Sequence, residues 1–335
     1  MCRCGVWLDF GHVQTYYQSR TYLSTQRAFN HLIFVNNTVM KASDKEDLIS
    51  AEGSWYEKLP IPLKKYTPTF LGWSEWNGKL AYVLEQECLP TLSDLFVFGN
   101  LDLNSWQRIF EATRKTVEDF RRFEAGEDKN IDIKVLFYQK TKNRIEAFSK
   151  NNNIDLSIKV SHVGSEVDII DDIIYESWNI VSEDMEETFY VMHGDYCLSN
   201  ILFDFRKNSI KLVDPRGMVE GRGNTIYGHT LYDVGKLAHS IIGGYDCIVS
   251  GYYDLFFSGY DFDVDISWPG NIYKIINAFH RIDFGNVKGG DRQVYAAVVL
   301  ILLSIIPLHS EDIKRQYALL ARAVQVYREM REYWI

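Results

Sequence analysis

The sequence is poor in cysteine and in basic residues, and it has no apolar run long enough to cross a membrane. Its five cysteines among 335 residues are odd in number and mostly scattered, which argues against a disulfide framework and for reduced thiols. Lys and Arg number 36 against 45 Asp and Glu, a formal charge of −9. A chain this acidic is a poor general binder of nucleic acid, because phosphate neutralisation needs clustered cations. The longest apolar stretch, 296–307, is too short to span a bilayer and predicts a buried core helix.

Export and metal signals are also missing near the start of the chain. Only residues 6–8 (VWL) form an apolar run before Asp9, far short of the apolar segment of a secretion signal. Cys2 and Cys4 form a C-x-C pair, but no second Cys or His pair lies nearby to complete a zinc site. Together with the reduced thiols, these absences predict a cytoplasmic protein with no structural zinc and no membrane association.

The length of 335 residues fits two lobes or two modest domains. Before Pro90 the chain alternates strand-like segments and turns around one helix, whereas after Pro90 apolar residues recur at helical spacing. We therefore expect a small α+β lobe over residues 1–88 and a larger, mainly helical lobe over 89–335. The first lobe should begin with a hairpin of strands 28–35 and 38–42, with Asn36-Asn37 as its turn. A helix over 43–59 should follow, capped by Ser43 and Asp44. A second hairpin should form from strands 73–78 and 79–86, with Asn77-Gly78 as its turn.

One short hairpin interrupts the helical part, and polar residues stand at both of its ends. Its predicted strands are 200–205 (NILFDF) and 209–214 (SIKLVD). The loop before it carries Asp195 and ends at Asn200, and the hairpin then returns the chain to the same edge and delivers Asp214. An Asp, an Asn and a second Asp offer oxygen ligands to a hard cation such as Mg²⁺, and one carboxylate remains to accept a proton. This set of residues is typical of phosphoryl transfer.

The pattern His193-x-Asp195-x4-Asn200 followed by Asp214 resembles the catalytic loop and metal-binding aspartate of the aminoglycoside phosphotransferase and choline kinase family. Members of that family are small-molecule kinases with a protein-kinase-like fold. The resemblance implies a bilobal α+β fold, with a small β-sheet-plus-helix N-lobe that binds nucleotide and a larger, mainly helical C-lobe for catalysis and substrate. It implies ATP and Mg²⁺ as cofactors, Asp195 as the catalytic base, and Asn200 and Asp214 as magnesium ligands. The alternative is a loop with capping Asp and Asn residues.

A strand lysine and a helix glutamate in the first lobe test this resemblance independently, because a kinase needs such a pair for the α- and β-phosphates. Lys41 lies on the second predicted strand. Glu52 lies four residues from both Leu48 and Tyr56, on the apolar side of the next helix. An inward-facing carboxylate needs a cationic partner, since an unpaired buried charge is costly. We therefore expect Lys41 to bind phosphates and Glu52 to orient it; the alternative is a lysine and a glutamate that both reach water.

Two further segments are assigned to the nucleotide by their positions in the family pattern. Ser24 and Thr25 lie upstream of Lys41, where family members carry a short phosphate-covering loop, and an ordinary polar turn is the alternative. The segment from Glu85 to Glu87 resembles the hinge between lobes, whose main chain would bind the adenine edge. The sequence contains neither G-x-G-x-x-G nor G-x4-G-K-[ST], so neither a Rossmann fingerprint nor a P-loop is expected.

The segment after Asp214 departs from the commoner family pattern. Residues 215–217 (PRG) stand where many members have an aromatic and an acidic residue. This variant resembles family members associated with bacterial surface-polysaccharide or sugar biosynthesis. Arg216 either contacts the transferred phosphate or a substrate anion, or pairs with a nearby acid. Further on, 232–237 (YDVGKL) resembles the start of a family helix whose aspartate, here Asp233, braces the catalytic loop.

These features predict an ATP-dependent phosphotransferase that moves the γ-phosphate to a hydroxyl of a small molecule, preferably a sugar or aminosugar of surface-polysaccharide metabolism. A protein substrate is disfavoured, because no long activation segment ending in A-P-E follows Asp214. A choline- or aminoglycoside-type kinase of a cationic acceptor is one alternative. A nucleotide-binding pseudokinase scaffold would have no need of an intact set of Lys41, Asp195, Asn200 and Asp214. A Mg²⁺-dependent phosphohydrolase leaves Lys41 and Glu52 unexplained. The sequence leaves open the acceptor, the choice between ATP and GTP, and the oligomeric state.

Overall fold

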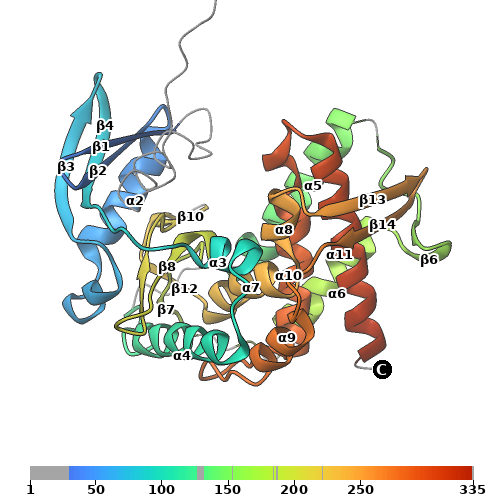
Figure 1. Cartoon of the computed structure of the whole chain (residues 1–335). Helices are drawn as coiled ribbons and strands as arrows, with labels where there is room; N and C mark the ends of the chain where they lie inside the picture. Colours follow the sequence, from blue (N-terminus) through green and yellow to red (C-terminus); the bar gives the residue numbers. More distant parts are fainter. Residues whose placement is uncertain are drawn as a thin grey trace, which may run out of the picture.

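The computed structural model describes residues 30–126, 132–152, 154–183, 185, 188–220 and 222–333. The chain forms two parts of unequal size, a sheet with one long helix at one end and a larger, mainly helical body at the other (Figure 1). We call the part that ends with β4 (Lys79–Glu85) the N-lobe and the part that begins with α3 (Leu92–Phe98) the C-lobe. This arrangement confirms the expected two-lobed α+β fold class.

The N-lobe is an antiparallel four-stranded sheet with one helix packed against it. Its other elements are β1 (Asn30–Val35), β2 (Thr38–Ser43), α2 (Glu46–Lys58), the 3₁₀ helix η1 (Ile61–Tyr66) and β3 (Phe70–Trp76). The strand order is β1-β2-β4-β3, and α2 contacts β2, β3 and β4. Because β2 lies between two other strands and beneath the helix, its Lys41 is only 5% exposed.

Both hairpins predicted for the N-lobe form, and their turns lie where the sequence indicated. Asn36 and Asn37 have φ of 50° and 60°, and Asn77 and Gly78 have φ of 50° and 77°. Two-residue hairpin turns require these left-handed values, which Asn and Gly adopt more readily than other residues. The turn residues therefore fixed the pairing of β1 with β2 and of β3 with β4.

The expected start of the N-lobe helix at Ser43 is wrong. Ser43 is the last residue of β2, where it pairs with Asn30, and α2 begins only at Glu46. The strand extends further than predicted because its partner strand satisfies the backbone at this position. The Ser43 hydroxyl still accepts a hydrogen bond from the N–H of Lys45 at 3.2 Å, so it terminates the strand and leads into the helix.

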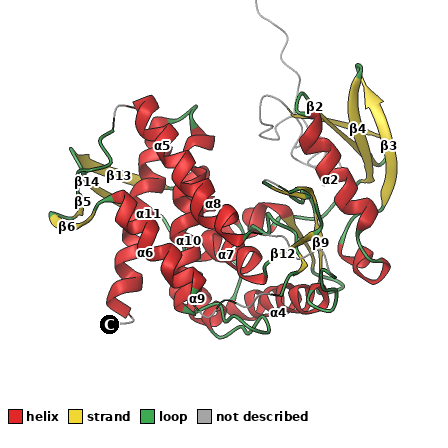
Figure 2. Ribbon diagram, turned by 180° about the vertical axis from the view of Figure 1, so that it is seen from behind, coloured by secondary structure: helices red, strands yellow, loops and turns green. Residues whose placement is uncertain are grey.

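Helices make up most of the C-lobe (Figure 2). After α3 they are α4 (Leu103–Phe120), the π-helical turn η2 (Val135–Gln139), α5 (Lys140–Asn152), α6 (Ile170–Ser182), the 3₁₀ turn η3 (Leu198–Asn200), α7 (Thr230–Ile241), α8 (Tyr245–Val249), α9 (Ile272–His280), α10 (Arg292–Ile305), the 3₁₀ turn η4 (Ile306–His309) and α11 (Ile313–Tyr333). Helix α10 lies at the centre of the lobe and contacts α5, α6, α7 and α11. The C-lobe core is therefore built around α10.

The apolar run 296–307 forms most of this central helix and the start of η4, and it is buried as its composition predicts. Arg292–His309 is long and apolar enough to cross a membrane by those two criteria, but 72% of the stretch is buried inside the protein. Every residue of α10 from Val294 onward is buried. A helix that is apolar on all sides and enclosed by other helices forms a hydrophobic core.

The C-lobe contains more β structure than the single hairpin that the sequence analysis expected. That hairpin forms from β8 (Ile201–Asp204) and β9 (Ser209–Leu212). The remaining strands are β5 (Val160–His162), β6 (Ser165–Asp168), β7 (Tyr190–Val191), β10 (Met218–Val219), β11 (Gly223–Asn224), β12 (Tyr227–Gly228), β13 (Tyr253–Ser258) and β14 (Asp261–Ile266). Four of them form a sheet in the order β13-β14-β5-β6. The sequence did not indicate this sheet, because β5 and β6 are short and the pairing of β5 with β14 joins segments distant in the chain.

Candidate active site

The segment between β7 and β8 brings Asp195 and Asn200 side by side. The Asn200 Nδ2 donates to Oδ2 of Asp195 at 2.9 Å and to the Asp195 carbonyl at 3.0 Å. These bonds use the donors of the Asn200 amide. Its Oδ1 receives from the described residues a single long contact, 3.4 Å from the Ser199 hydroxyl, so this oxygen is available as a ligand. The Asp195 side chain is 40% exposed, so an acceptor can reach it.

Asp233, near the start of α7, holds the backbone immediately before Asp195. Its carboxylate accepts hydrogen bonds from the N–H groups of His193 at 2.7 Å and Gly194 at 2.8 Å. Burial raises the pKa of Asp233 to about 7, and these two N–H donors oppose the rise. Asp233 therefore fixes the loop conformation and does not itself face the open side of the site, since it is only 3% exposed.

Asp214 follows β9 in a backbone conformation that few residues other than glycine adopt. Its φ is 56°, and aspartate is among the residues that tolerate such values. The N–H of Asp214 donates to the Tyr56 hydroxyl at 3.2 Å, which ties it to α2 of the N-lobe. The side chain remains 51% exposed. Strained positions of this kind cluster at binding and catalytic sites.

Lys41 joins the two lobes at this point. Its Nζ lies 2.7 Å from Oε2 of Glu52 on α2 and 3.0 Å from Oδ1 of Asp214 in the C-lobe. Burial disfavours the charged form of Lys41, but the two carboxylates outweigh it and raise the pKa of Lys41 above its usual range. Lys41 therefore stays protonated, and its ammonium lies beside the Asp214 carboxylate.

Glu52 is the buried partner that orients Lys41. Its side chain is 16% exposed, and the Tyr82 hydroxyl donates to the same Oε2 at 2.9 Å. Burial raises the pKa of the Glu52 carboxyl, and the ammonium of Lys41 opposes that rise. The structure thus brings together five of the residues chosen from the sequence: Lys41, Glu52, Asp195, Asn200 and Asp214.

Lys236 is a site residue that the sequence analysis missed. Its Nζ lies 2.7 Å from Oδ1 of Asp195, and it is 8% exposed on α7. Burial alone would raise the pKa of Asp195, but the Lys236 ammonium outweighs it and holds that pKa well below its usual range. A signal was present, because a lysine in an otherwise apolar helix next to Asp233 needs an anionic partner.

The hinge offers less main chain to a nucleotide than the sequence analysis expected. The N–H of Glu85 donates to the Thr69 carbonyl at 2.9 Å, and the N–H of Gln86 donates to the Asn37 carbonyl at 2.8 Å. The expectation that the main chain is available from Glu85 onward is therefore wrong for these two donors, because they complete the N-lobe sheet. The N–H groups of Glu85 and Gln86 are therefore not free to bind an adenine edge.

The oxygen donors of the site fit a magnesium ion that is bound together with phosphates. The Asn200 Oδ1 and the Asp214 carboxylate are ligands of the type that Mg²⁺ prefers, and this ion commonly takes only one or two protein ligands beside phosphates and waters. Within the described residues, no group of three or more His, Cys, Asp or Glu could hold a metal. The predicted phosphate-loop residues Ser24 and Thr25 lie outside the described part of the chain.

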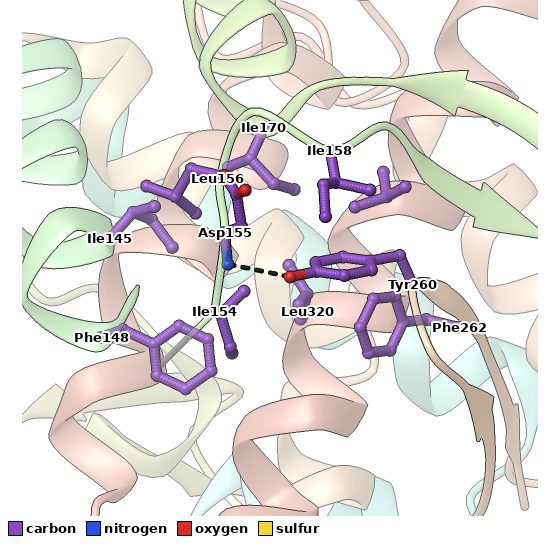
Figure 3. A pocket seen from close by; sticks show the side chains of 11 residues that line it. Ile145, Phe148, Ile154, Asp155, Leu156, Ile158, Ile170, Tyr260, Phe262 and Leu320 are labelled. Atoms are coloured by element: carbon purple, nitrogen blue, oxygen red, sulfur yellow. Dashed lines mark hydrogen bonds between the residues drawn. The ribbon is translucent and has the colours of Figure 1, made fainter. Parts of the chain in front are cut away.

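An apolar cavity elsewhere in the C-lobe is not part of this site. Figure 3 shows it between α5, α11 and β14, with the N–H of Asp155 donating to the Tyr260 hydroxyl at 2.9 Å. Its space is about 10 Å³, no more than a single water molecule needs. None of the site residues lines it, so it is a packing gap in the hydrophobic core.

Solved structures share this fold over nearly the whole chain. A Plasmodium vivax ethanolamine kinase has a TM-score of 0.51 at 11% identity, covering 96% of this chain and 91% of that one. A thermostable mutant of the aminoglycoside phosphotransferase APH(4)-Ia, in a ternary complex with AMP-PNP and hygromycin B, has a TM-score of 0.50 at 11% identity, covering 93% and 97%. No protein-family model and no curated protein matches the sequence. The structural likeness confirms the predicted protein-kinase-like, bilobal fold.

Proposed function

We propose that the protein is an ATP-dependent phosphotransferase that moves the γ-phosphate of ATP to a hydroxyl of a small molecule. The observation that carries this proposal is the ammonium of Lys41, buried between Glu52 and Asp214 where the two lobes meet. A triphosphate held between lobes needs a cation from one lobe and a metal-binding carboxylate from the other. The shared fold with an ethanolamine kinase and with a phosphotransferase bound to AMP-PNP supports nucleotide use.

The reaction uses Asp195 to position the acceptor. The acceptor oxygen bonds to the γ-phosphorus while the bond from that phosphorus to the β-phosphate oxygen breaks, ADP leaves, and the hydroxyl proton passes to Asp195. Because Lys236 holds the pKa of Asp195 low, the carboxylate is ionised and accepts a hydrogen bond from the hydroxyl before transfer. The proton moves late, after the oxygen has given electron density to phosphorus and become acidic.

Charge neutralisation supplies the remaining part of the mechanism. Magnesium held by Asn200 and Asp214 would neutralise the developing charge on the β- and γ-phosphates. Lys41 would bring a second positive charge to the α- and β-phosphates, and Glu52 holds the Lys41 side chain in position by its ion pair. Positioning and electrostatics of this kind account for most of the rate in phosphoryl transfer.

Asp195→Ala tests the proposed base. We expect nucleotide binding to be retained, because Lys41 and Asp214 are untouched, while turnover falls by about 10²- to 10⁴-fold, the usual contribution of a positioned acid–base group. Asp171→Ala, at an exposed site on α6, is the matched control and should keep full activity. Full activity in Asp195→Ala with unchanged ATP binding would contradict its role. A wild-type protein that binds AMP-PNP but phosphorylates no acceptor would support the pseudokinase alternative.

For the acceptor we propose a hydroxyl of a sugar or aminosugar. The support is the resemblance of 215–217 (PRG) to kinases of sugar and surface-polysaccharide biosynthesis. The cytoplasm is the proposed compartment, because Cys88, Cys197 and Cys247 are all free thiols, as a reducing compartment would keep them. A coupled assay for ADP release over sugars, amino alcohols and aminoglycosides tests the acceptor class directly.

A further inference from the structure

Lys140 and Arg216 converge on a single phenol oxygen beside the catalytic loop. The Nζ of Lys140 donates to the Tyr232 hydroxyl at 2.6 Å, and Nη1 of Arg216 donates to the same oxygen at 3.0 Å. The Lys140 Nζ lies 5.0 Å and the Arg216 guanidinium 5.9 Å from the centre of the Tyr232 ring. Two basic side chains from different segments therefore share one phenol oxygen as their acceptor.

Neither cation is neutralised by the part of the chain that the structure describes. No carboxylate of a described residue lies within 4.0 Å of the charged nitrogens of Lys140 or Arg216. Lys140 is 6% exposed; its burial lowers its pKa, and the charges of Arg216, Arg144 and Lys236 lower it further. Burying like charges beside one another is costly, so an anion that binds between Lys140 and Arg216 would favour the charged form of Lys140.

The two cations lie next to the residue at which an acceptor would react. Tyr232 and Lys236 are four residues apart on α7 and so share one face of the helix, and Lys236 is 2.7 Å from Asp195. The Arg216 side chain lies against Gly194, where an added Cβ would come within 2.7 Å of the Arg216 Cβ. Arg216 and Tyr232 therefore flank the backbone that carries Asp195.

The backbone before Lys140 is unusual in a way that fits a binding role. Val135–Gln139 forms a π-helical turn directly before α5, and such turns are rare and frequent at functional sites. The next residue, Thr141, donates through its hydroxyl to the carbonyls of Phe137 at 2.6 Å and Leu300 at 3.0 Å. Lys140 is thus held in place by the core helix α10 and not by solvent.

We propose that the acceptor carries a phosphate or carboxylate close to the hydroxyl that is phosphorylated, and that Arg216 and Lys140 bind this anionic group. The inference rests on the proposed phosphotransferase function and narrows its acceptor class to sugar phosphates or sugar acids. The guanidinium offers paired donors to an oxyanion, and the ammonium adds a point charge. A choline-like or aminoglycoside-like acceptor would instead bring positive charge to Arg216, Lys140 and Lys236.

Binding of a simple anion tests the site without knowledge of the full acceptor. The full-length protein is saturated with AMP-PNP and MgCl₂, so that the nucleotide phosphates already occupy Lys41 and Asp214, and is then titrated with inorganic phosphate or with choline in a calorimeter. We expect phosphate to bind and choline not to bind. Choline binding, or the absence of phosphate binding, overturns the inference. Failure of AMP-PNP itself to bind contradicts the proposed function instead, so the two failures are distinguishable.

Three substitutions locate the anion. Arg216→Gln and Lys140→Met should each weaken phosphate binding to the AMP-PNP complex at least tenfold, whereas Lys150→Gln, an exposed lysine on the same helix, should leave it unchanged. Lys140→Met should also not lower the melting temperature, because replacing a buried unpaired cation by a similar apolar side chain is neutral or stabilising. Equal phosphate affinity in Arg216→Gln and wild type would refute the site. A large loss of stability in Lys140→Met would assign Lys140 to the fold and not to the acceptor.

Turnover with matched sugars extends the test to catalysis. Glucose, glucosamine, glucuronate and glucose 1-phosphate share one ring and differ in charge. We expect kcat/KM for the better of the two anions to exceed that for glucose at least tenfold, and Arg216→Gln to raise the KM of that anion with no change in the KM for ATP. A preference for glucosamine would overturn the inference while leaving the phosphotransferase function intact.

Discussion

Replacing Lys41 by methionine removes the ammonium that stands between the two lobes and leaves Glu52 buried. Among the described residues, the carboxylate then keeps the Tyr82 hydroxyl, at 2.9 Å, as its one hydrogen-bond donor. Asp214 loses the same partner but is 51% exposed, so water can replace it. The stability cost therefore arises mainly at Glu52, and removing its charge as well should recover most of that cost.

The burial of the pair sets the expected size of each effect. Lys41 and Glu52 side chains are 6% and 16% exposed, so solvent screening is slight. Removing one partner of such a pair costs about 3 kcal/mol or more in the free energy of unfolding, and we expect this for Lys41→Met. Glu52→Gln should cost about 1–2 kcal/mol, because Lys41 keeps Asp214 as a partner. The double variant should be within about 1 kcal/mol of wild type, which gives a coupling energy of about 3–5 kcal/mol.

Urea unfolding followed by tryptophan fluorescence measures the free energies of unfolding of wild type, the two single variants and the double variant. An ATP-coupled assay measures the turnover of the same four proteins. Stability should return in Lys41→Met/Glu52→Gln, but turnover should not, because the phosphates still lack their ammonium. Lys79 and Asp44 form an exposed ion pair in the same lobe, so the cycle Lys79→Met/Asp44→Asn should be nearly additive. A coupling energy below about 0.5 kcal/mol for Lys41 and Glu52 would refute the buried pair. Recovery of turnover in the double variant would refute the phosphate-binding role of Lys41.

Two further predictions concern the acceptor and metal sides of the site. In wild type the lowered pKa of Asp195 keeps its carboxylate ionised at pH values well below the usual pKa of an aspartate. In Lys236→Met that pKa should rise, because the ammonium no longer opposes burial, so the acidic limb of the pH–rate profile should move to higher pH. An unmoved limb would exclude control of Asp195 by Lys236. In Asp214→Asn the dependence of turnover on free Mg²⁺ should shift to at least tenfold higher concentration, whereas Asp204→Asn, at the end of β8, should leave the Mg²⁺ titration unchanged.

Local patterns in the sequence determined much of the fold. The Asn-Asn and Asn-Gly turns specified both N-lobe hairpins, since few other residues adopt the φ values that these turns need. The apolar run that became α10 predicted a buried helix from composition alone. The spacing of Asp195, Asn200 and Asp214 around a hairpin predicted their convergence, because a hairpin returns the chain to the edge from which it began.

Contacts between residues far apart in the chain were decided only by the tertiary structure. Lys41 and Asp214 are 173 positions apart and Lys140 and Tyr232 are 92 apart. The resemblance implied that Lys41 and Asp214 act on the same nucleotide, but no local pattern predicts their direct contact or the pairing of Lys140 with Tyr232. Lys236 meets Asp195, and Arg216 meets Tyr232, because the packing of α5 and α7 around α10 aligns their polar side chains with the loop. The sequence alone thus indicated which residues are candidates for phosphoryl chemistry. The charges that surround these residues were decided by helix packing, since burial and distance determine which charges act on one another.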